Sequence, residues 1–316
     1  MKMKIQINDA LKYAEQKISA EGLFNWFLDA EIILSFVLKK NKEFLLTYPE
    51  KKISNQKWRQ FKKLIARRAK KEPVAHIVGH KEFFGLDFLI DKNTLIPRPE
   101  TEMMVEETIN RIKRHGTKNK NLKKIILIDV GTGSGCVPIA IAKNISNKNI
   151  KLFAIDISPQ ALQIANKNAA RHKIKIKLLQ DGLLNPFIQK SLFFPSQQCI
   201  PTSKPRLPAD RIPSYYPIIT ANLPYLSYKI WRRAMQDVKK FEPKTALISK
   251  EGGLKHYRLL LEQIKKARIK DGLVFLEIDP AQKNKIQKLI KKILPTAAAQ
   301  IKKDLSGKDR LVIISL

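Results

Sequence analysis

The sequence predicts an α/β protein in which a doubly wound, mostly parallel sheet follows a smaller helical domain. From about residue 120 onward, short apolar runs rich in β-branched residues alternate with segments of helical periodicity. Strands and helices in alternation indicate a parallel sheet with helices on both faces. Before about residue 90, apolar residues instead recur at three- and four-residue spacing, which indicates helices alone.

The composition suits a globular protein of two domains with a strongly basic charge. The chain has 316 residues, 44% of them hydrophobic, and carries 61 Lys and Arg against 28 Asp and Glu, a net charge of +33. Such an excess attracts polyanions, so proximity to the ribosome or to RNA through a basic surface is one interpretation. The lysines are spread along the whole chain, and a compositional bias without function is the other interpretation.

The sequence carries no signal for a membrane, a metal or a disulfide framework. Its apolar runs fall far short of the roughly 20 residues that span a bilayer, and the opening MKMKIQIND lacks the long apolar stretch of a secretory signal. The two cysteines, Cys136 and Cys199, form no metal-binding pattern, and the five histidines are scattered. We expect a cytoplasmic monomer without a metal site.

Helices and then a hairpin are expected in the first third of the chain. Ser54 is expected to cap the third of three amphipathic helices and Pro73 to end it. A hairpin, EFFGLDFLID, follows with Gly85 at its turn, and LIPRPETE leads into a helix from about Pro99. The three helices are expected in ALKYAEQK, FLDAEIILSFVLKK and QKWRQFKKLIARRAK.

The second half of the chain predicts the sheet. Residues 191–217, with six prolines and no sustained period, are expected to form a long loop inserted before the fourth strand. Ligands of such sheets bind beyond the carboxyl ends of the strands, so residues at strand ends are the candidates for function. The strands are expected at residues 125–130, 151–156, 174–180, 217–222, 272–279 and 310–315.

The first candidate site follows the first strand of the sheet, in DVGTGSGC. Its glycines let a ligand approach the backbone, and the helix that follows favours a polar or anionic group. The spacing is not the dinucleotide fingerprint, because Cys136 stands where a third glycine of that pattern would lie. G-x-G-x-G after Asp129 is instead typical of S-adenosylmethionine-dependent methyltransferases. A structural turn without a ligand is the alternative.

Two aspartates at strand ends extend this candidate site. Asp156 ends the second strand, 25 residues after Gly131, where a carboxylate can accept both hydroxyls of a ribose. The cap of the next helix is its alternative role. Asp181 ends the third strand and could bond an adenine amino group, or it could only form a turn with Gly182.

The third candidate is the tetrapeptide Asn-Leu-Pro-Tyr, which follows the fourth strand. Asn-x-Pro-Tyr is typical of methyltransferases that act on planar amide or amino nitrogens. The side-chain oxygen of Asn222 and the carbonyl of Leu223 can accept the two N–H groups of such a nitrogen, and Pro224 fixes where that carbonyl points. Tyr225 can pack its ring against the planar group. A strand exit made of turn-forming residues is the alternative.

Together these motifs resemble the HemK/PrmC family, methyltransferases that modify the side-chain amide of a glutamine in peptide chain release factors. The resemblance implies a Rossmann-like, seven-stranded class I methyltransferase domain at residues 103–316. A helical substrate-recognition domain at 1–80 and a β-hairpin linker at 81–102 would precede it. Besides DVGTGSG and NLPY, the resemblance rests on RRAKKEPVAHIVGHKEFFGLDFLIDKNTLIPRPETE, FEPKTALISKEGGLKHYR, LEIDPAQ and DLSGKDRLVI.

The resemblance also implies the roles of individual residues. It names S-adenosylmethionine as the cofactor and a release factor, at the glutamine of its GGQ motif, as the substrate. The implied cofactor-binding residues are Asp129, Gly131, Thr132, Gly133, Ser134, Gly135, Asp156, Asp181, Gly182 and Asn222. The implied catalytic and substrate-binding residues are Asn222, Leu223, Pro224 and Tyr225, with Arg98 and Glu100 of PRPETE also binding the substrate.

Three features depart from the family pattern and leave two other hypotheses open. Leu223 replaces the first proline of the family's NPPY, Gly182 stands where relatives often carry an aromatic residue, and the loop at 191–217 is longer than usual. Asn-Leu-Pro-Tyr is also found in adenine-N6 methyltransferases, so methylation of ribosomal RNA or DNA is the alternative activity. A catalytically silent scaffold that binds a release factor or the ribosome is the third hypothesis.

Overall fold

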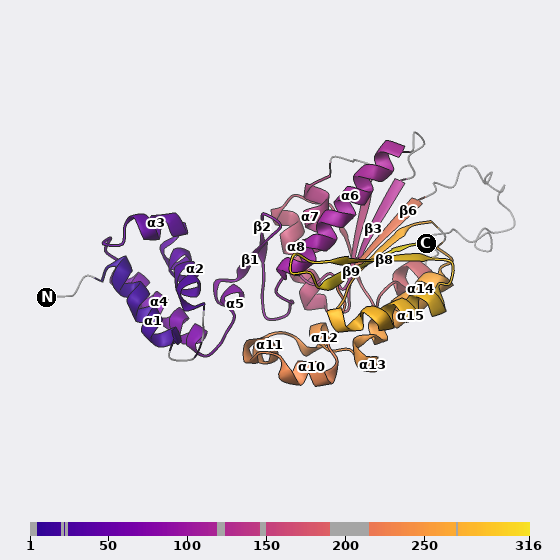
Figure 1. Cartoon of the computed structure of the whole chain (residues 1–316). Coiled ribbons are helices and arrows are strands. Elements are labelled where there is room, and N and C mark those ends of the chain that lie inside the picture. Colours follow the sequence, from indigo (N-terminus) through magenta and orange to yellow (C-terminus); the bar gives the residue numbers. More distant parts are fainter. Residues whose placement is uncertain are drawn as a thin grey trace. The chain divides into compact units, whose positions relative to one another are not determined.

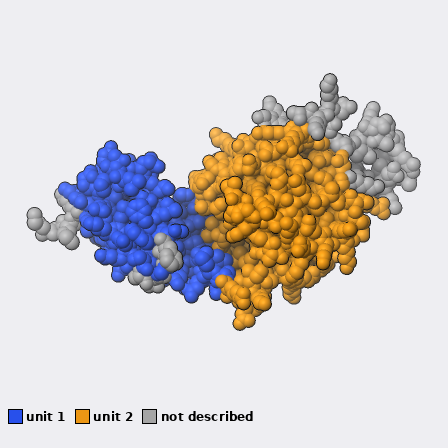
Figure 2. All heavy atoms as spheres, in the orientation of Figure 1, with its two compact units in different colours: residues 1–80, 90–92, 234–241 blue, residues 81–89, 93–233, 242–316 orange. Residues whose placement is uncertain are grey.

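The computed structural model describes residues 5–19, 22, 25–118, 124–145, 150–189, 215–269 and 271–316. The chain forms two compact units, coloured separately in Figure 2. Most of the loop expected at residues 191–217 lies outside the described residues, and its last three positions belong to a strand rather than to a loop. The first unit contains residues 1–80, 90–92 and 234–241, and the second contains residues 81–89, 93–233 and 242–316.

The first unit is helical, as its apolar spacing predicts. The helices α1 (Ile7–Ser19), α2 (Trp26–Leu38) and α4 (Asn55–Ala69) pack against one another around a shared apolar core. Ser54 caps α4 as expected, because its side chain accepts a hydrogen bond from the backbone N–H of Lys57. The shorter helices of this unit are α3 (Lys42–Thr47), α5 (Val74–Val78) and α11 (Gln236–Phe241).

The expectation that Pro73 ends the third helix is wrong. α4 ends already at Ala69, because Lys71 adopts a left-handed conformation with φ of 68°. The N–H groups of Lys70 and Glu72 then close the last turn on the carbonyl of Arg67. Pro73 instead precedes α5 as its N-cap residue.

A buried ion pair joins α2 and α4 within the first unit. Arg68 Nε donates to Asp29 Oδ2 over 2.6 Å, and only 10% and 12% of the two side chains are exposed. Arg68 also donates from Nη1 to the carbonyl of Glu72. A buried charge needs such partners, because it has lost its contact with water.

The predicted hairpin opens the second unit. Its strands are β1 (His80–Phe83) and β2 (Leu86–Leu89). The two turn residues, Phe84 and Gly85, have φ values of 52° and 71°, and this pair of positive values suits a tight two-residue hairpin. The 3₁₀ helix η1 (Pro99–Thr101) then leads into α6 (Glu102–Lys118), close to where the sequence predicts a helix.

The second unit is built on a seven-stranded sheet with helices on both faces, which confirms the predicted fold class. Its strand order is β5-β4-β3-β6-β7-β9-β8. The strands from β5 to β7 are mutually parallel, and β9 runs antiparallel to both β7 and β8. The bounds are β3 Lys124–Val130, β4 Ile150–Asp156, β5 Lys177–Gln180, β6 Tyr215–Ala221, β7 Leu273–Glu277, β8 Ala298–Lys303 and β9 Asp309–Ser315.

The helices of this unit fall into two layers (Figure 1). α6, α7 (Cys136–Lys143) and α8 (Pro159–Arg171) lie on one face of the sheet, and α14 (Lys255–Lys266) and α15 (Lys283–Ile293) lie on the other. Short helical turns complete the unit: α9 (Asn185–Gln189), α10 (Tyr228–Arg233), α12 (Lys244–Leu247), α13 (Lys250–Gly253) and η4 (Pro280–Gln282).

The sequence prediction misses or misplaces three parts of the sheet. The sequence pattern does not indicate β8, because AAQIKK has no apolar alternation and most of its residues are exposed at the sheet edge. The third strand begins at Lys177 and not at residue 174. The fourth begins at Tyr215, two residues before the expected start.

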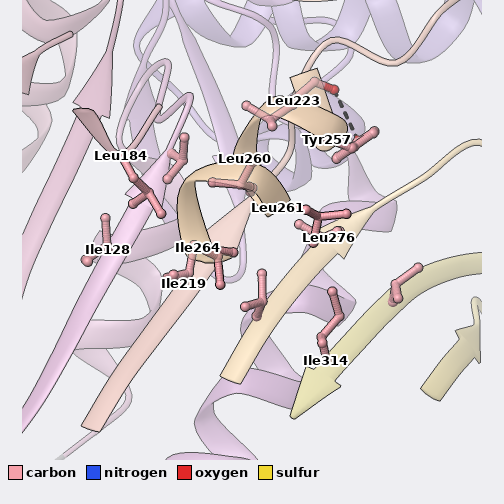
Figure 3. Packing of buried hydrophobic residues seen from close by; sticks show 14 of the residues in the cluster. Ile128, Leu184, Ile219, Leu223, Tyr257, Leu260, Leu261, Ile264, Leu276 and Ile314 are labelled. Atoms are coloured by element: carbon pink, nitrogen blue, oxygen red, sulfur yellow. Dashed lines mark hydrogen bonds between the residues drawn. The ribbon is translucent and has the colours of Figure 1, made fainter. Parts of the chain in front are cut away.

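The apolar core under α14 reaches the carboxyl end of β6. Figure 3 shows Leu260, Leu261 and Ile264 of α14 packed over the strands, with Leu223 and Tyr257 at the upper edge of the same cluster. The residues that follow β6 are therefore packed directly against the apolar core of this unit. No helix within the described ranges has the length and apolar character needed to cross a bilayer.

Candidate active site

The glycine-rich loop between β3 and α7 lies at the carboxyl edge of the sheet. Gly131, Gly133 and Gly135 have φ values of 73°, 55° and 78°, a conformation in which a residue with a Cβ is strained. The backbone N–H groups of Gly131 and Thr132 donate to the carbonyl of Ile155 in β4 and anchor the loop. A Cβ added at Gly133 would meet no atom within 4 Å, so the loop leaves space beside its backbone.

Two buried hydroxyl groups in this loop have no hydrogen-bond partner at standard geometry. Thr132 Oγ1 and Ser134 Oγ have no partner at hydrogen-bond geometry among the described residues, although the Thr132 hydroxyl lies near Asp129 and the Ser134 hydroxyl near Cys136, where each acts on the pKa of that neighbour. A buried polar atom without a partner costs free energy, and such atoms are commonly satisfied by water or a ligand. Together with the open backbone, these hydroxyls fit a site for a polar small molecule.

Asp129 is a buried carboxyl group at the start of the loop. It is 3% exposed and accepts a hydrogen bond of 2.7 Å from Thr220 Oγ1, its register partner on β6. Burial raises the pKa of its carboxyl group to about 6, and the nearby hydroxyls of Thr132 and Thr220 oppose that rise. Asp129 is thus buried at the end of β3, directly before the loop, and its contact with a cofactor stays a prediction.

Asp156 connects the end of β4 to the glycine-rich loop. Its carboxylate accepts hydrogen bonds from the backbone N–H groups of Gly133, at 2.8 Å, and Ser158, at 2.9 Å. Burial raises its pKa. The alternative role as a helix cap is wrong, because the cap of α8 is Ser158, whose side chain accepts from the N–H of Ala161. A carboxylate held beside the loop keeps further lone pairs for a ligand's hydroxyl groups.

Asp181 lies next to Asp156 but is engaged locally. Its backbone N–H donates to the carbonyl of Asp156, and its Oδ1 accepts from the N–H of Gly182 and from Asn185 Nδ2. These contacts match the predicted Asp-Gly turn and occupy one of the two carboxylate oxygens. Gly182 does not need to be glycine for its backbone, because its φ is not positive and a Cβ there would make only an ordinary contact, 3.6 Å from Asn185.

The Asn222 side chain is held by a chain of buried polar groups. Asn222 Nδ2 donates to Thr101 Oγ1 over 3.1 Å, and Thr101 Oγ1 donates to Glu277 Oε2 over 2.6 Å. Thr101 and Glu277 are 3% and 2% exposed. Burial raises the pKa of Glu277 to about 7, and the hydrogen bond from Thr101 opposes that rise. Among the described residues, none donates a hydrogen bond to Asn222 Oδ1, so this oxygen is available to a ligand.

Leu223 buries its side chain and offers its carbonyl. The residue is 3% exposed and belongs to the apolar core under α14. The hydroxyl of Tyr257 lies near the Leu223 carbonyl oxygen, at 3.4 Å, and makes a closer hydrogen bond to the carbonyl of Glu277 (Figure 3 marks the first). A hydroxyl has one hydrogen to donate, so the Leu223 carbonyl keeps its capacity to accept from a ligand.

Two short helical elements, η4 and α13, contact the tetrapeptide. Gln282 Nε2 donates to the carbonyls of Tyr225, at 2.9 Å, and Gly252, at 3.2 Å. Gly253 packs so tightly here that an added Cβ would lie 1.9 Å from the Tyr225 carbonyl oxygen. The hydroxyl of Tyr225 points to Glu277 Oε1 at 3.4 Å, and burial raises the pKa of this tyrosine above its usual range.

The two residues of PRPETE that were expected to bind the substrate have different surroundings. Arg98 forms an ion pair with the buried carboxylate of Glu242, which also accepts from the N–H of Ile96. Glu100 is exposed and raises the pKa of Glu277 by its charge. Thr101, between Glu100 and the helix α6, is the member of this segment that contacts Asn222.

Comparisons with known proteins identify the family. The family model described as "PrmC N-terminal domain" matches residues 9–79, and the model described as "Methyltransferase domain" matches residues 119–182. The release factor glutamine methyltransferase of Thermodesulfovibrio yellowstonii is 33% identical over 90% of this chain and 91% of its own. That of Clostridium acetobutylicum is 30% identical over 98% of both chains, and that of Bacillus anthracis is 28% identical over 99% and 100%.

The chain belongs to the release factor glutamine methyltransferase family. The resemblance stated from the sequence motifs is thereby confirmed. The similarity to these relatives covers both units of the chain and is not limited to the methyltransferase domain.

Within this member of the release factor glutamine methyltransferase family, the structure brings most of the predicted site residues to one edge of the sheet. It also adds four residues that the sequence motifs do not single out, namely Thr101, Gly253, Glu277 and Gln282. All four lie in segments that carry the family resemblance, PRPETE, FEPKTALISKEGGLKHYR and LEIDPAQ, but no local pattern assigns them a role. Glu277 ends β7, and its position at a strand end is the one signal that could have marked it.

Proposed function

We propose that this chain transfers a methyl group from S-adenosylmethionine to the side-chain amide nitrogen of a glutamine in a peptide chain release factor. The observation that carries the proposal is the pair of free acceptors at the end of β6, Asn222 Oδ1 and the Leu223 carbonyl oxygen. They adjoin the glycine-rich loop, because the Leu223 side chain lies against Gly131. A methyl donor and an amide acceptor would therefore meet at one point.

The proposed reaction asks the protein mainly to position its substrate. S-adenosylmethionine, when bound, supplies a methyl group already activated on a sulfonium. An amide nitrogen is a poor nucleophile because its lone pair is delocalised into its carbonyl group. Two acceptors that take its two N–H groups hold the nitrogen in place and stabilise the charge that develops on it. Asn222 Oδ1 and the Leu223 carbonyl supply these two acceptors.

The cofactor is proposed to lie along the glycine-rich loop and Asp156. The space beside Gly133, the buried hydroxyls of Thr132 and Ser134, and the carboxylate of Asp156 fit a polar ligand that carries a ribose. Asp156 would accept the ribose hydroxyls while its N–H donors hold it in place. Asp181 uses only its Oδ1 in the turn, and its other carboxylate oxygen would accept from the adenine amino group.

The family of the relatives supports a release factor as the substrate class. The match to the PrmC N-terminal domain model covers residues 9–79 of the helical first unit, which supports the proposal that this unit recognises the protein substrate. Full-length relatives at 30% and 33% identity are named release factor glutamine methyltransferases. A substrate shared with them is therefore favoured over ribosomal RNA or DNA.

The experiment that tests this function offers methyl-labelled S-adenosylmethionine to the enzyme with a release factor, a ribosomal protein or ribosomal RNA in parallel. Label is expected on the release factor, at the glutamine of its GGQ motif, and a release factor with that glutamine replaced by alanine is the control. Label on RNA would overturn the substrate. Failure to bind S-adenosylmethionine in calorimetry would overturn the enzyme assignment and favour the scaffold hypothesis.

Two variants separate the proposed roles within the site. Asn222→Ala is expected to abolish methyl transfer and to leave cofactor affinity close to that of the wild type. Asp156→Ala is expected to weaken cofactor binding, because the ribose would lose its acceptor. Unchanged cofactor affinity in Asp156→Ala, measured by calorimetry, would contradict the ribose role.

A further inference from the structure

The orientation of the Asn222 amide decides whether the proposed reaction can occur. An asparagine side chain presents an oxygen that accepts on one side and an NH₂ group that donates on the other. Only the oxygen can accept an N–H of a substrate amide. If the side chain were turned over, its NH₂ group would face the substrate N–H and repel it. A site of this kind therefore needs a device that fixes the orientation.

The buried chain from Glu277 to Asn222 has the polarity that such a device requires. An ionised carboxylate only accepts hydrogen bonds, so Thr101 must give its single hydroxyl hydrogen to Glu277 Oε2, 2.6 Å away. The Thr101 oxygen then has only lone pairs left for Asn222. These lone pairs can be met by Nδ2, at 3.1 Å, and not by Oδ1.

We propose that Thr101 and Glu277 are positioning residues that hold the Asn222 amide in its reactive orientation. The negative charge of Glu277 fixes the direction of the Thr101 hydroxyl, and that hydroxyl fixes Nδ2 of Asn222 toward the protein interior. Oδ1 is thereby kept for the substrate. This inference rests on the proposed function, since it assigns to two further residues the support of the same amide-binding step.

Protonation of Glu277 would remove this polarity. Opposing effects set the pKa of Glu277. Burial, the largest effect, and the charge of Glu100 favour the neutral carboxyl group. The hydroxyls of Thr101 and Tyr225 and the charge of Arg310 on β9 favour the anion. The hydroxyl of Tyr257 is directed to the backbone carbonyl of Glu277 and not to its carboxylate. The resulting pKa is about 7. A neutral carboxyl group can donate to Thr101, which then could donate to Asn222 Oδ1 and reverse the amide.

Threonine variants test the first link of the chain. Thr101→Val removes the hydroxyl but keeps the shape, and kcat for release factor methylation is expected to fall about 100-fold. Thr101→Ser keeps the hydroxyl and is expected to restore most of the rate. Thr108→Val is the matched control, because Thr108 is also buried but bonds only the Met104 carbonyl of its own helix. Its kcat should equal that of the wild type.

Two further readouts separate positioning from a loss of structure. Cofactor affinity by calorimetry and the unfolding midpoint should be similar for Thr101→Val and Thr108→Val, so that the difference between them lies in kcat. Wild-type kcat at Thr101→Val, or a Thr101→Ser variant as slow as Thr101→Val, would overturn the inference.

The pH profile tests the charge of Glu277. With cofactor and release factor saturating, wild-type kcat is expected to decrease as pH falls through about 7, because Glu277 gains its proton there. Glu277→Gln should have a lower kcat and no such decrease, because its side chain does not titrate. A decrease of the same midpoint in Glu277→Gln would overturn the role of the charge.

The labelling experiment on the wild type and the variants distinguishes failure of this inference from failure of the proposed function. If the wild-type enzyme places no label on the release factor, the proposed function is wrong and the inference falls with it. If the wild type methylates the release factor and the Thr101 and Glu277 variants match it, the function stands and the inference alone is wrong.

Discussion

Leu223 lies directly against Gly131: its Cδ2 is 3.1 Å from the position that a Cβ on Gly131 would occupy. The loop proposed to hold the cofactor and the tetrapeptide proposed to hold the substrate therefore touch through one side chain. The residue that departs from the family's proline is thus not a passive spacer. Its buried side chain joins the two halves of the candidate site to the core under α14.

Substitution of Gly131 should show this contact as a loss of stability. Gly131→Ala meets both a positive φ of 73° and the Leu223 methyl group, whereas Gly133→Ala meets a positive φ of 55° and open space. Both variants are expected to lose about 1–2 kcal/mol of unfolding free energy from the backbone. Gly131→Ala should lose more, because the contact adds to that cost. Equal losses in chemical denaturation would contradict the tight contact.

Replacement of Leu223 by the family's proline should destabilise this protein. Leu223→Pro removes buried atoms that nothing refills, and we expect a loss of about 2 kcal/mol in unfolding free energy. Leu223→Met keeps the volume and should lose less than about 1.5 kcal/mol. Methyl transfer by the folded Leu223→Pro protein should persist, since the carbonyl at this position remains. A proline variant as stable as the wild type would show that the leucine packing contributes nothing.

The two glycines of α13 should respond very differently to alanine. Both have positive φ, 67° for Gly252 and 94° for Gly253. A Cβ on Gly252 would meet nothing within 4 Å, but one on Gly253 would lie 1.9 Å from the Tyr225 carbonyl oxygen and 2.3 Å from Gln282 Nε2. Gly253→Ala is therefore expected to displace the tetrapeptide and to reduce methyl transfer strongly, while Gly252→Ala loses stability only modestly. Similar activities of the two variants in the labelling assay would refute this.

Glu277 should reduce stability as pH rises, even though the proposed reaction needs its charge. Its pKa is raised from 4.5 to about 7 in the folded protein, so the folded state holds the proton more tightly than the unfolded chain. Stability of the wild type should therefore fall between these two pH values, by on the order of 3 kcal/mol.

Glu277→Gln removes this dependence and should be the more stable protein above pH 7, with lower activity. Denaturation curves at both ends of the pH window measure the effect, and a variant at the exposed Glu106 (Glu106→Gln) is the control. If the difference between Glu277→Gln and the wild type is the same at both ends, the carboxyl group is not titrating in the window.

Two arginines provide a matched test of buried and exposed ion pairs. Arg68 pairs with Asp29 inside the first unit, with side-chain exposures of 10% and 12%, while Arg171 pairs with Asp87 at exposures of 45% and 40%. Arg68→Met leaves the buried carboxylate of Asp29 without its ion-pair partner and should lose about 3–5 kcal/mol of unfolding free energy. Arg171→Met should lose about 0–1 kcal/mol. Denaturation of the full chain by urea, followed by circular dichroism, compares the two, and equal losses would count against the burial argument.

The sequence permits prediction of those parts of the site that are made of neighbouring residues. The glycine-rich loop, Asp156 and Asn222 each follow a short apolar strand, so the local pattern locates them at the carboxyl edge of the sheet. Thr101 is 121 positions from Asn222 and 176 from Glu277. Their meeting depends on how η1, β6 and β7 pack, and no periodicity within a single segment reports such packing.

The same distinction, between local sequence pattern and packing of distant segments, explains the errors in the predicted fold. Continuous apolar runs predict buried strands such as β3, but β8 is an edge strand in which most residues are exposed and polar or small, so it has no such run. The end of α4 depends on the left-handed conformation of Lys71, which the side-chain pattern does not reveal. Pro73 lies at a boundary between two helices, but it marks the start of α5 and not the end of α4.

The sheet's second half has a consequence for shortened forms of the protein. β9 is inserted between β7 and β8, so β7 obtains its second neighbour only from the segment Asp309–Ser315. All five residues of β7 are buried. A chain truncated before Asp309 would present this apolar strand as a bare edge with unpaired backbone groups, which is a template for intermolecular pairing. Such a product should aggregate, so premature termination here would burden the cell with insoluble protein and not simply with an inactive enzyme.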